Sequence, residues 1–237
     1  MPEFSPVILL SRPRAQADAF ADDLRKRFGE DLRIEISPIL EIEFLSPEVT
    51  LPVVAAYVFT SRNAVLAWEA SGMACQGTAY CVGNRTANAA AKIGFSAISA
   101  GGDVNALIKL IKKENIQEPL IYPRGENVKV DLKSALAKTG HSVTDCIVYR
   151  QKKVALDPLI ESRLRSEKHL IIPVFSPLSA KWLSQSLVSL PSQATVVALS
   201  PDIAGAWERT DDISVAKYPD SSHMIAQIAT ILSPASP

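Results

Sequence analysis

The residues in this sequence that could do chemistry are small polar side chains and single arginines placed directly after short apolar runs. The clearest example is "YVFTSRNAVLAW" (residues 57–68), which begins with strand composition and ends with helix-forming composition. Ser61 or Thr60 is placed to cap the predicted helix. A helix start has unpaired N–H groups and a partial positive charge, so this junction could be only a capped turn or could also bind an anion.

Similar polar junctions recur along the chain after other apolar segments. Together they offer hydroxyl groups, amides and guanidinium groups, which suit a polyanionic ligand held between domains. Two interpretations stay open, because the hydroxyl residues could also be helix caps and the arginines could form surface ion pairs. The candidate substrate-binding residues are Arg12, Thr60, Ser61, Asn63, Asn84, Thr86, Arg124, Ser176 and Ser200.

Motifs for nucleophilic, nucleotide or metal chemistry do not occur in this sequence. We find no G-x-S-x-G, no P-loop, no G-x-G-x-x-G and no Cys–His arrangement. Cys75, Cys81 and Cys146 lack metal-ligand spacing and form an odd count, which predicts reduced thiols, an intracellular protein and no metal site.

Charge and hydropathy exclude several classes of partner. Among 237 residues, 25 basic side chains balance 25 acidic ones, so there is no electrostatic argument for nucleic acid or an anionic membrane as the partner. No stretch approaches the roughly 18 apolar residues of a membrane span, and the N-terminus lacks a basic segment before a long apolar run. We therefore expect a soluble cytoplasmic protein.

The elements that must position these residues alternate between strand and helix patterns. Strands alternating with helices predict an α/β fold with parallel sheets flanked by helices, and ligands in such sheets bind beyond the carboxyl ends of the strands. The polar junctions fall at those ends.

The order of elements also repeats, which predicts two similar domains. Residues 119–140 resemble residues 7–28, with Arg124 matched to Arg12, and residues 169–183 resemble residues 55–68, with Ser176 matched to Ser61. "CVGNRTANAA" (81–90) aligns with "ALSPDIAGAW" (198–207). Identities are few, so the prediction depends on pattern at a constant offset.

The segments "VFTSRNAV", "YCVGNRTANAAAKIG", "LIYPRGE", "DCIVYR" and "FSPLSAKWL", in this order, resemble the uroporphyrinogen-III synthase family. The resemblance covers about residues 7–232. It implies two α/β domains joined by two extended linkers that act as a hinge, with the ligand cleft between the domains. The implied boundaries are 1–37 with 153–237 for a discontinuous domain one, 41–147 for domain two, and 38–40 and 148–152 for the linkers.

The family's reaction explains why no classical catalytic triad is present. Its substrate, hydroxymethylbilane, is a linear tetrapyrrole with eight carboxylates, whose hydroxymethyl group loses its hydroxyl as water under push from its own pyrrole nitrogen. The resemblance implies closure through a spiro intermediate to uroporphyrinogen III with inversion of ring D, and no cofactor. It also implies a monomer, with transient contact with the enzyme that makes the bilane as an open alternative.

The resemblance places the catalytic candidate at Tyr149, in "CIVYRQ"; without the resemblance, a strand tyrosine packed between linkers is the simpler interpretation. In "LSPDIAGAW", Ser200 replaces a glycine frequent in the family, and Asp202 is expected to cap a helix or complement its dipole and not to contact a carboxylate. A non-catalytic two-domain binder or sensor of an acidic small molecule is the second hypothesis, because fold alone does not separate it from an enzyme.

Overall fold

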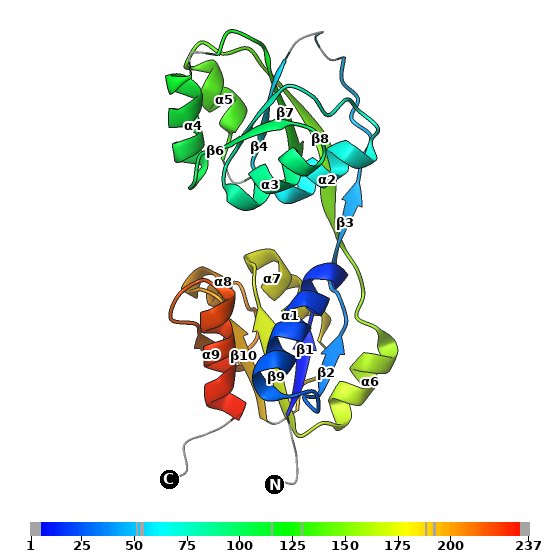
Figure 1. Ribbon diagram of the computed structural model, residues 1–237. Helices are drawn as coiled ribbons and strands as arrows, with labels where there is room; N and C mark the ends of the chain where they lie inside the picture. Colours follow the sequence, from blue (N-terminus) through cyan, green and yellow to red (C-terminus); the bar gives the residue numbers. More distant parts are fainter. Residues whose placement is uncertain are drawn as a thin grey trace. The chain divides into compact units, whose positions relative to one another are not determined.

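The computed structural model describes residues 6–232 except 51, 53, 54, 115, 129, 188 and 192. These residues form two compact units (Figure 1). Unit 1 comprises the described residues up to Glu41 and from Lys152 onward, and unit 2 comprises Ile42–Gln151. The predicted domain ends at residues 1–5 and 233–237 lie outside the described residues.

Unit 1 is a five-stranded parallel sheet of order β11-β10-β9-β1-β2. Its strands are β1 (Val7–Leu10), β2 (Ile34–Ile36), β9 (His169–Val174), β10 (Gln193–Ala198) and β11 (Asp212–Val215). Its helices are α1 (Arg14–Phe28), α6 (Pro158–Ser166), α7 (Pro177–Ser186), α8 (Pro201–Gly205) and α9 (Ser221–Leu232).

Unit 2 contains a six-stranded sheet of order β3-β8-β7-β4-β5-β6. The strands are β3 (Leu40–Phe44), β4 (Ala56–Phe59), β5 (Thr78–Cys81), β6 (Ser96–Ser99), β7 (Leu120–Gly125) and β8 (Val143–Lys153). The helices are α2 (Arg62–Ala70), α3 (Asn84–Lys92), α4 (Val104–Lys113) and α5 (Leu132–Ala137). All pairs among β4 to β8 are parallel.

The chain passes between the units twice, in β3 and in β8. The two strands are antiparallel, because Leu45 N donates to Val148 O (2.8 Å) and Val154 N donates to Ile39 O (3.0 Å). Residues 148–152, the second predicted linker, belong to β8, and Leu40 of the first predicted linker begins β3.

The two sheets have the same strand order once the internal repeat is taken into account. Unit 1 reads β2-β1-β9-β10-β11 and unit 2 reads β8-β7-β4-β5-β6, which is the doubly wound order 2-1-3-4-5 in both cases. The strands that correspond are those matched by the sequence repeat: β1 with β7, β9 with β4, and β10 with β5. Unit 2 is therefore a circular permutation of unit 1, since the equivalents of β1 and β2 come last along its chain.

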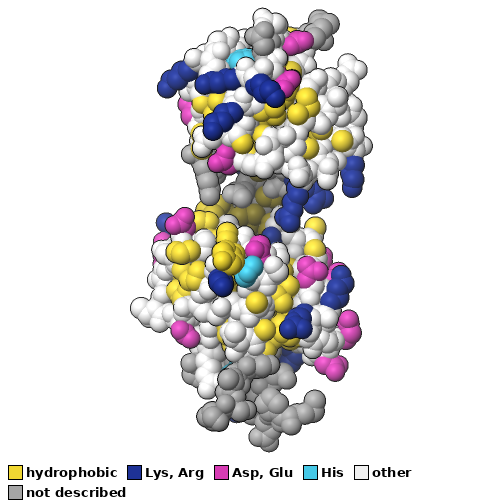
Figure 2. Space-filling view, turned by 60° about the vertical axis from the view of Figure 1, so that its left-hand side comes forward, with side chains coloured by type: hydrophobic (Ala, Val, Ile, Leu, Met, Phe, Trp, Pro, Cys, Tyr) yellow, Lys and Arg dark blue, Asp and Glu magenta, His cyan; other side chains and the backbone are white. Residues whose placement is uncertain are grey.

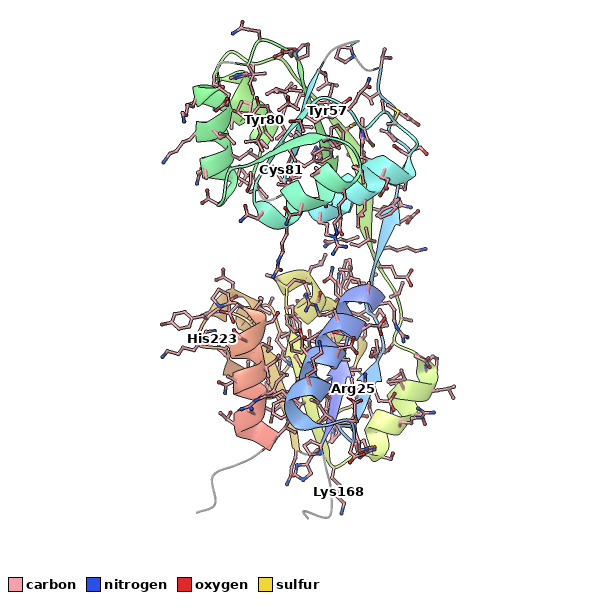
Figure 3. The ribbon with its side chains drawn as sticks, viewed as in Figure 1. Arg25, Tyr57, Tyr80, Cys81, Lys168 and His223 are labelled. Atoms are coloured by element: carbon pink, nitrogen blue, oxygen red, sulfur yellow. The ribbon has the colours of Figure 1, made fainter. Side chains whose placement is uncertain are left out.

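Both faces of each sheet are covered by helices, as the alternating pattern predicts (Figure 1). In unit 2, Tyr57 and Cys81 pack with α2 and α3 on one face, while Tyr80 packs with α4 and α5 on the other (Figure 3). In unit 1, Phe20 of α1 and Met224 of α9 pack on the same sheet face. Because buried strands alternate their side chains between the two faces, each sheet holds its helices at fixed positions relative to its carboxyl edge.

The surface carries both signs of charge, as Figure 2 shows for one face. None of the helices in the described part of the chain combines the length and apolar character needed to cross a membrane.

Candidate functional site

The candidate site in unit 2 lies at the carboxyl edge of its sheet, where the strand order reverses between β7 and β4. In doubly wound sheets the loops after two such strands diverge to opposite faces and leave a crevice that binds ligands. Ser61 follows β4, and Arg124 and Gly125 end β7. The equivalent point in unit 1 lies between β1 and β9, which are followed by Arg12 and Ser176.

Ser61 is the N-cap of α2, which settles the choice between the two hydroxyl residues predicted there. Its Oγ accepts a hydrogen bond from Asn63 N at 3.0 Å. Thr60 does not cap the helix; its Oγ1 lies 3.3 Å from the phenol oxygen of buried Tyr122. Burial raises the pKa of Tyr122, and the contacts with Thr60 and Arg124 oppose that rise. Tyr122 therefore remains a neutral anchor for the loop that carries Ser61.

Tyr149 lies against this cap. Its phenol donates a hydrogen bond to Ser61 Oγ at 3.2 Å, joining residues 88 positions apart. The ring covers Gly125 closely: a Cβ at that position would lie 2.7 Å from Cζ and 2.9 Å from Oη of Tyr149. Glycine is therefore needed here for space, and the ring is held between Gly125 and the start of α2. A small pocket of about 50 Å³ adjoins the ring, lined by Gly125, Glu126, Asn127, Tyr149 and Gln151.

A β-bulge in β8 turns Tyr149 toward α2. Arg124 pairs with Ile147, but the next residue, Gly125, pairs with Tyr149, so Val148 is an extra residue. Val148 and Tyr149 consequently both pack on the face covered by α2 and α3, although successive strand residues normally alternate between faces. Without the bulge, the phenol would point to the opposite face, away from Ser61.

Arg124 forms the ion pair that was one of its two predicted roles. Its Nε donates to Asp145 Oδ2 at 2.8 Å, and Lys133 Nζ donates to the other oxygen of Asp145 at 2.7 Å. Arg124 Nη1 also donates to the carbonyl oxygens of Gly125 (3.0 Å) and Glu126 (3.2 Å). Burial raises the pKa of Asp145, but the hydrogen bonds from the two cations outweigh it and lower the pKa overall. The network fixes the backbone that supports the Tyr149 ring; ligand binding by Arg124 remains a prediction.

The second junction of unit 2 differs from the prediction at Thr86. The N-cap of α3 is Gly83, while Thr86 is the third helical residue and is buried, with its N–H bonded to Gly83 O at 3.1 Å. The prediction that Thr86 caps the helix is wrong, because the glycine ahead of Asn84 already has the extended conformation of a cap. Asn84 is exposed at the first helical position.

A groove of about 500 Å³ runs between α2 and α3. Three cations line it, Arg62, Arg85 and Lys92, with one acid, Glu69. Within the described residues, none of the three cations is paired with a carboxylate. The groove therefore places positive charge beside both helix starts.

In unit 1, Ser176 caps α7 by accepting a hydrogen bond from Ser179 N at 3.1 Å, and its Oγ lies 2.7 Å from Ser179 Oγ. The guanidinium of Arg12 lies over the Phe175 ring, 3.9 Å from its centroid, and donates to Gln16 at 3.1 Å. Ser200 is the N-cap residue of α8 without a side-chain cap hydrogen bond, and Asp202 lies in the first turn, where it complements the helix dipole.

Within each unit, the structure thus places the predicted polar junctions at the carboxyl edge of the sheet. Sequence reasoning missed Gly125 and Asp145 as supports of Tyr149. The glycine directly after the β7 arginine, in "PRGE", was the available signal, because a glycine ending a buried strand often marks close approach of another group.

The fold and this edge define a class: an α/β protein of two permuted doubly wound units, each with helix starts and polar side chains at its switch point. The family model described as uroporphyrinogen-III synthase HemD matches residues 18–226, and the chain belongs to this family.

Solved structures of low sequence identity have a similar fold. The uroporphyrinogen-III synthetase from Helicobacter pylori matches with a TM-score of 0.69 and 14% identity, over 96% of this chain and 100% of that one. A mutant uroporphyrinogen III synthase from Thermus thermophilus matches with a TM-score of 0.50 and 17% identity, over 96% and 99% of the two chains. A search of curated proteins gave no significant match.

Proposed function

We propose that this protein catalyses the cyclisation of hydroxymethylbilane to uroporphyrinogen III, with loss of water and inversion of ring D, in tetrapyrrole biosynthesis. Family membership over most of the chain supports the reaction class. The observation that carries the proposal is the position of Tyr149, whose phenol lies against the Ser61 cap at the switch point of unit 2.

The chemical demand on the protein is small. The pyrrole nitrogen of the substrate expels the hydroxyl group, and the electrophile formed can close without further help. The protein must assist departure of the hydroxyl and hold the chain in the shape that leads to ring inversion. Tyr149 contributes to this assistance, because its phenol O–H is a hydrogen-bond donor at the switch point.

Binding of the substrate carboxylates is distributed over both units in this proposal. The chain has no net charge, so no large basic field attracts the ligand. Helix N–H groups and hydroxyls at α2, α3, α7 and α8 bind carboxylates, with single guanidinium groups from Arg12 and Arg124. Arg124 would do so while keeping its bond to Asp145.

The decisive experiment incubates the protein with freshly generated hydroxymethylbilane, oxidises the product and resolves the porphyrin isomers. We expect type III product at a rate above the uncatalysed closure. Type I product at the uncatalysed rate would exclude the synthase and leave the non-catalytic binder of an acidic small molecule.

Tyr149→Phe tests the assigned role within that assay. One positioned acid contributes about 10²–10⁴-fold, and because this substrate ionises readily we expect a loss at or below about 10²-fold. Type III product should still dominate, since the binding groups set the shape of the bound substrate. An unchanged rate at equal thermal stability would return Tyr149 to a purely structural role.

A further inference from the structure

The hydroxyl of Ser61 has both of its acceptor positions occupied. A serine hydroxyl offers one hydrogen and two lone pairs. One lone pair receives Asn63 N–H at 3.0 Å, and the other receives the Tyr149 phenol at 3.2 Å. The hydrogen of Ser61 must therefore point away from both donors, and within the described residues no side chain or carbonyl accepts it.

The same hydrogen bond directs the phenol of Tyr149 toward Ser61. Its proton is engaged by Ser61 Oγ, and its ring is fixed against Gly125, where even a methyl group would lie 2.7 Å from Cζ. The hydroxyl group with a proton left for a ligand is consequently that of Ser61, which is partly exposed.

Two features make Ser61 a stronger donor than an ordinary serine. Hydrogen bonds in a chain polarise one another, so a hydroxyl that accepts from a phenol gives its own proton more readily. Ser61 also caps α2, where the helix start stabilises negative charge developing on the oxygen.

We propose that Ser61, and not Tyr149, contacts the departing hydroxyl of the substrate, and that Tyr149 acts through Ser61 as a proton relay. This inference rests on the proposed function. The bond between carbon and oxygen breaks with its electron pair going to oxygen, and the Ser61 proton completes the water molecule. The phenol proton of Tyr149 moves to Ser61, and the proton released when the attacking pyrrole ring regains its aromaticity restores the phenol.

The equivalent serine of unit 1 provides a matched control. Ser176 caps α7 as Ser61 caps α2, but its second partner is the Ser179 hydroxyl and not a phenol. If Ser61 only caps a helix and binds a carboxylate, the two serines should behave alike. If Ser61 is the last member of a relay, Ser61→Ala should lower kcat as Tyr149→Phe does, and Ser176→Ala should not.

The test is a double-mutant cycle on the rate of type III formation, using Tyr149→Phe, Ser61→Ala and the pair. We expect each single variant to lower kcat by about 10- to 100-fold, and the pair to be no slower than the slower single variant, because the two groups act as one unit. Ser61→Thr, which keeps a hydroxyl, should recover most of the rate. Ser176→Ala should cost about tenfold or less, the effect of one neutral hydrogen bond.

Folding is controlled with Ser61→Gly, since glycine is itself a favourable N-cap residue and replaces serine there with little loss of stability. Three outcomes would overturn the relay while the synthase assignment stands. The Ser61→Gly variant could keep the parental kcat, it could change only in KM, or the double variant could lose rate by the product of the two single losses. A parent protein that makes no type III product would overturn both proposals together.

Discussion

Gly125→Ala perturbs the packing behind Tyr149 without altering any polar group. The added methyl would lie 2.7 Å from Cζ and 2.9 Å from Oη of Tyr149, whereas non-bonded carbon atoms pack at about 3.5–4.0 Å. The ring must therefore move by about 1 Å, and the phenol cannot keep its present 3.2 Å bond to Ser61. Backbone strain does not contribute, because Gly125 is not among the described glycines with positive φ.

We expect Gly125→Ala to lower the rate of type III formation by about 10- to 100-fold, since a displacement of 1 Å in a catalytic group can cost about 10²-fold. The free energy of unfolding should fall by about 1–3 kcal/mol, the usual cost of overpacking. The measurements are single-turnover formation of product, resolved by isomer, and chemical unfolding followed by circular dichroism.

Gly205→Ala is the matched control, because a methyl group there meets nothing within 4 Å; the rate should not change. In a Tyr149→Phe background, Gly125→Ala should destabilise the fold but slow turnover no further, since no phenol remains to be displaced. Parental turnover by Gly125→Ala would refute the reasoning, and a further tenfold loss in the Phe background would show that Gly125 acts by another route.

Three further predictions concern other parts of unit 2. Because two cations lower the pKa of Asp145 against the effect of burial, its stabilising contribution is complete above the unfolded-state pKa of about 3.9 and is lost as pH falls through the lower folded-state value. Parent and Asp145→Asn should thus differ in free energy of unfolding by about 1–3 kcal/mol at pH 7, and the difference should shrink as pH falls through the folded-state pKa of Asp145; a constant difference would contradict this. Arg62 and Arg85 line the groove between α2 and α3, where they could attract substrate carboxylates. Replacing both by Gln should therefore raise KM several-fold at low salt with little change in kcat. A KM that stays at the parental value would show that this groove binds no substrate carboxylate. Burial raises the pKa of the Cys81 and Cys146 thiols to about 11, so neither should react with iodoacetamide at pH 8 until the protein is unfolded, as mass spectrometry would show.

The sequence was most informative where the structure depends on neighbours along the chain. Apolar runs bounded by turn residues predicted the strands at Val7–Leu10 and Ala56–Phe59. The caps at Ser61 and Ser176 were also predictable, because a cap joins a side chain to an N–H only two or three residues away. Thr86 shows the limit of that reasoning, since a hydroxyl near a helix start is no cap when the glycine ahead of the helix already occupies that position.

The internal repeat gave the equivalence of strands but not their order in the sheets. The matches of Arg12 with Arg124 and of Ser61 with Ser176 indicate which polar junctions of the two units correspond. That Arg12 and Ser176 flank one switch point, and Arg124 and Ser61 the other, follows only from the strand order, in which β1 lies beside β9 and β7 beside β4. Strand pairing is decided by packing between segments distant in sequence, and pattern along the chain does not specify it.

The sequence by itself therefore determined that polar junctions follow buried strands in two repeated α/β units, because apolar periodicity and helix capping are local effects. Only the tertiary structure decided that Tyr149 meets Ser61. That contact needs a bulge at Val148, a glycine at 125 and an ion pair between Arg124 and Asp145. Each of these depends on the register between β7 and β8, which is fixed by the packing of the whole sheet and not by residues adjacent in the chain.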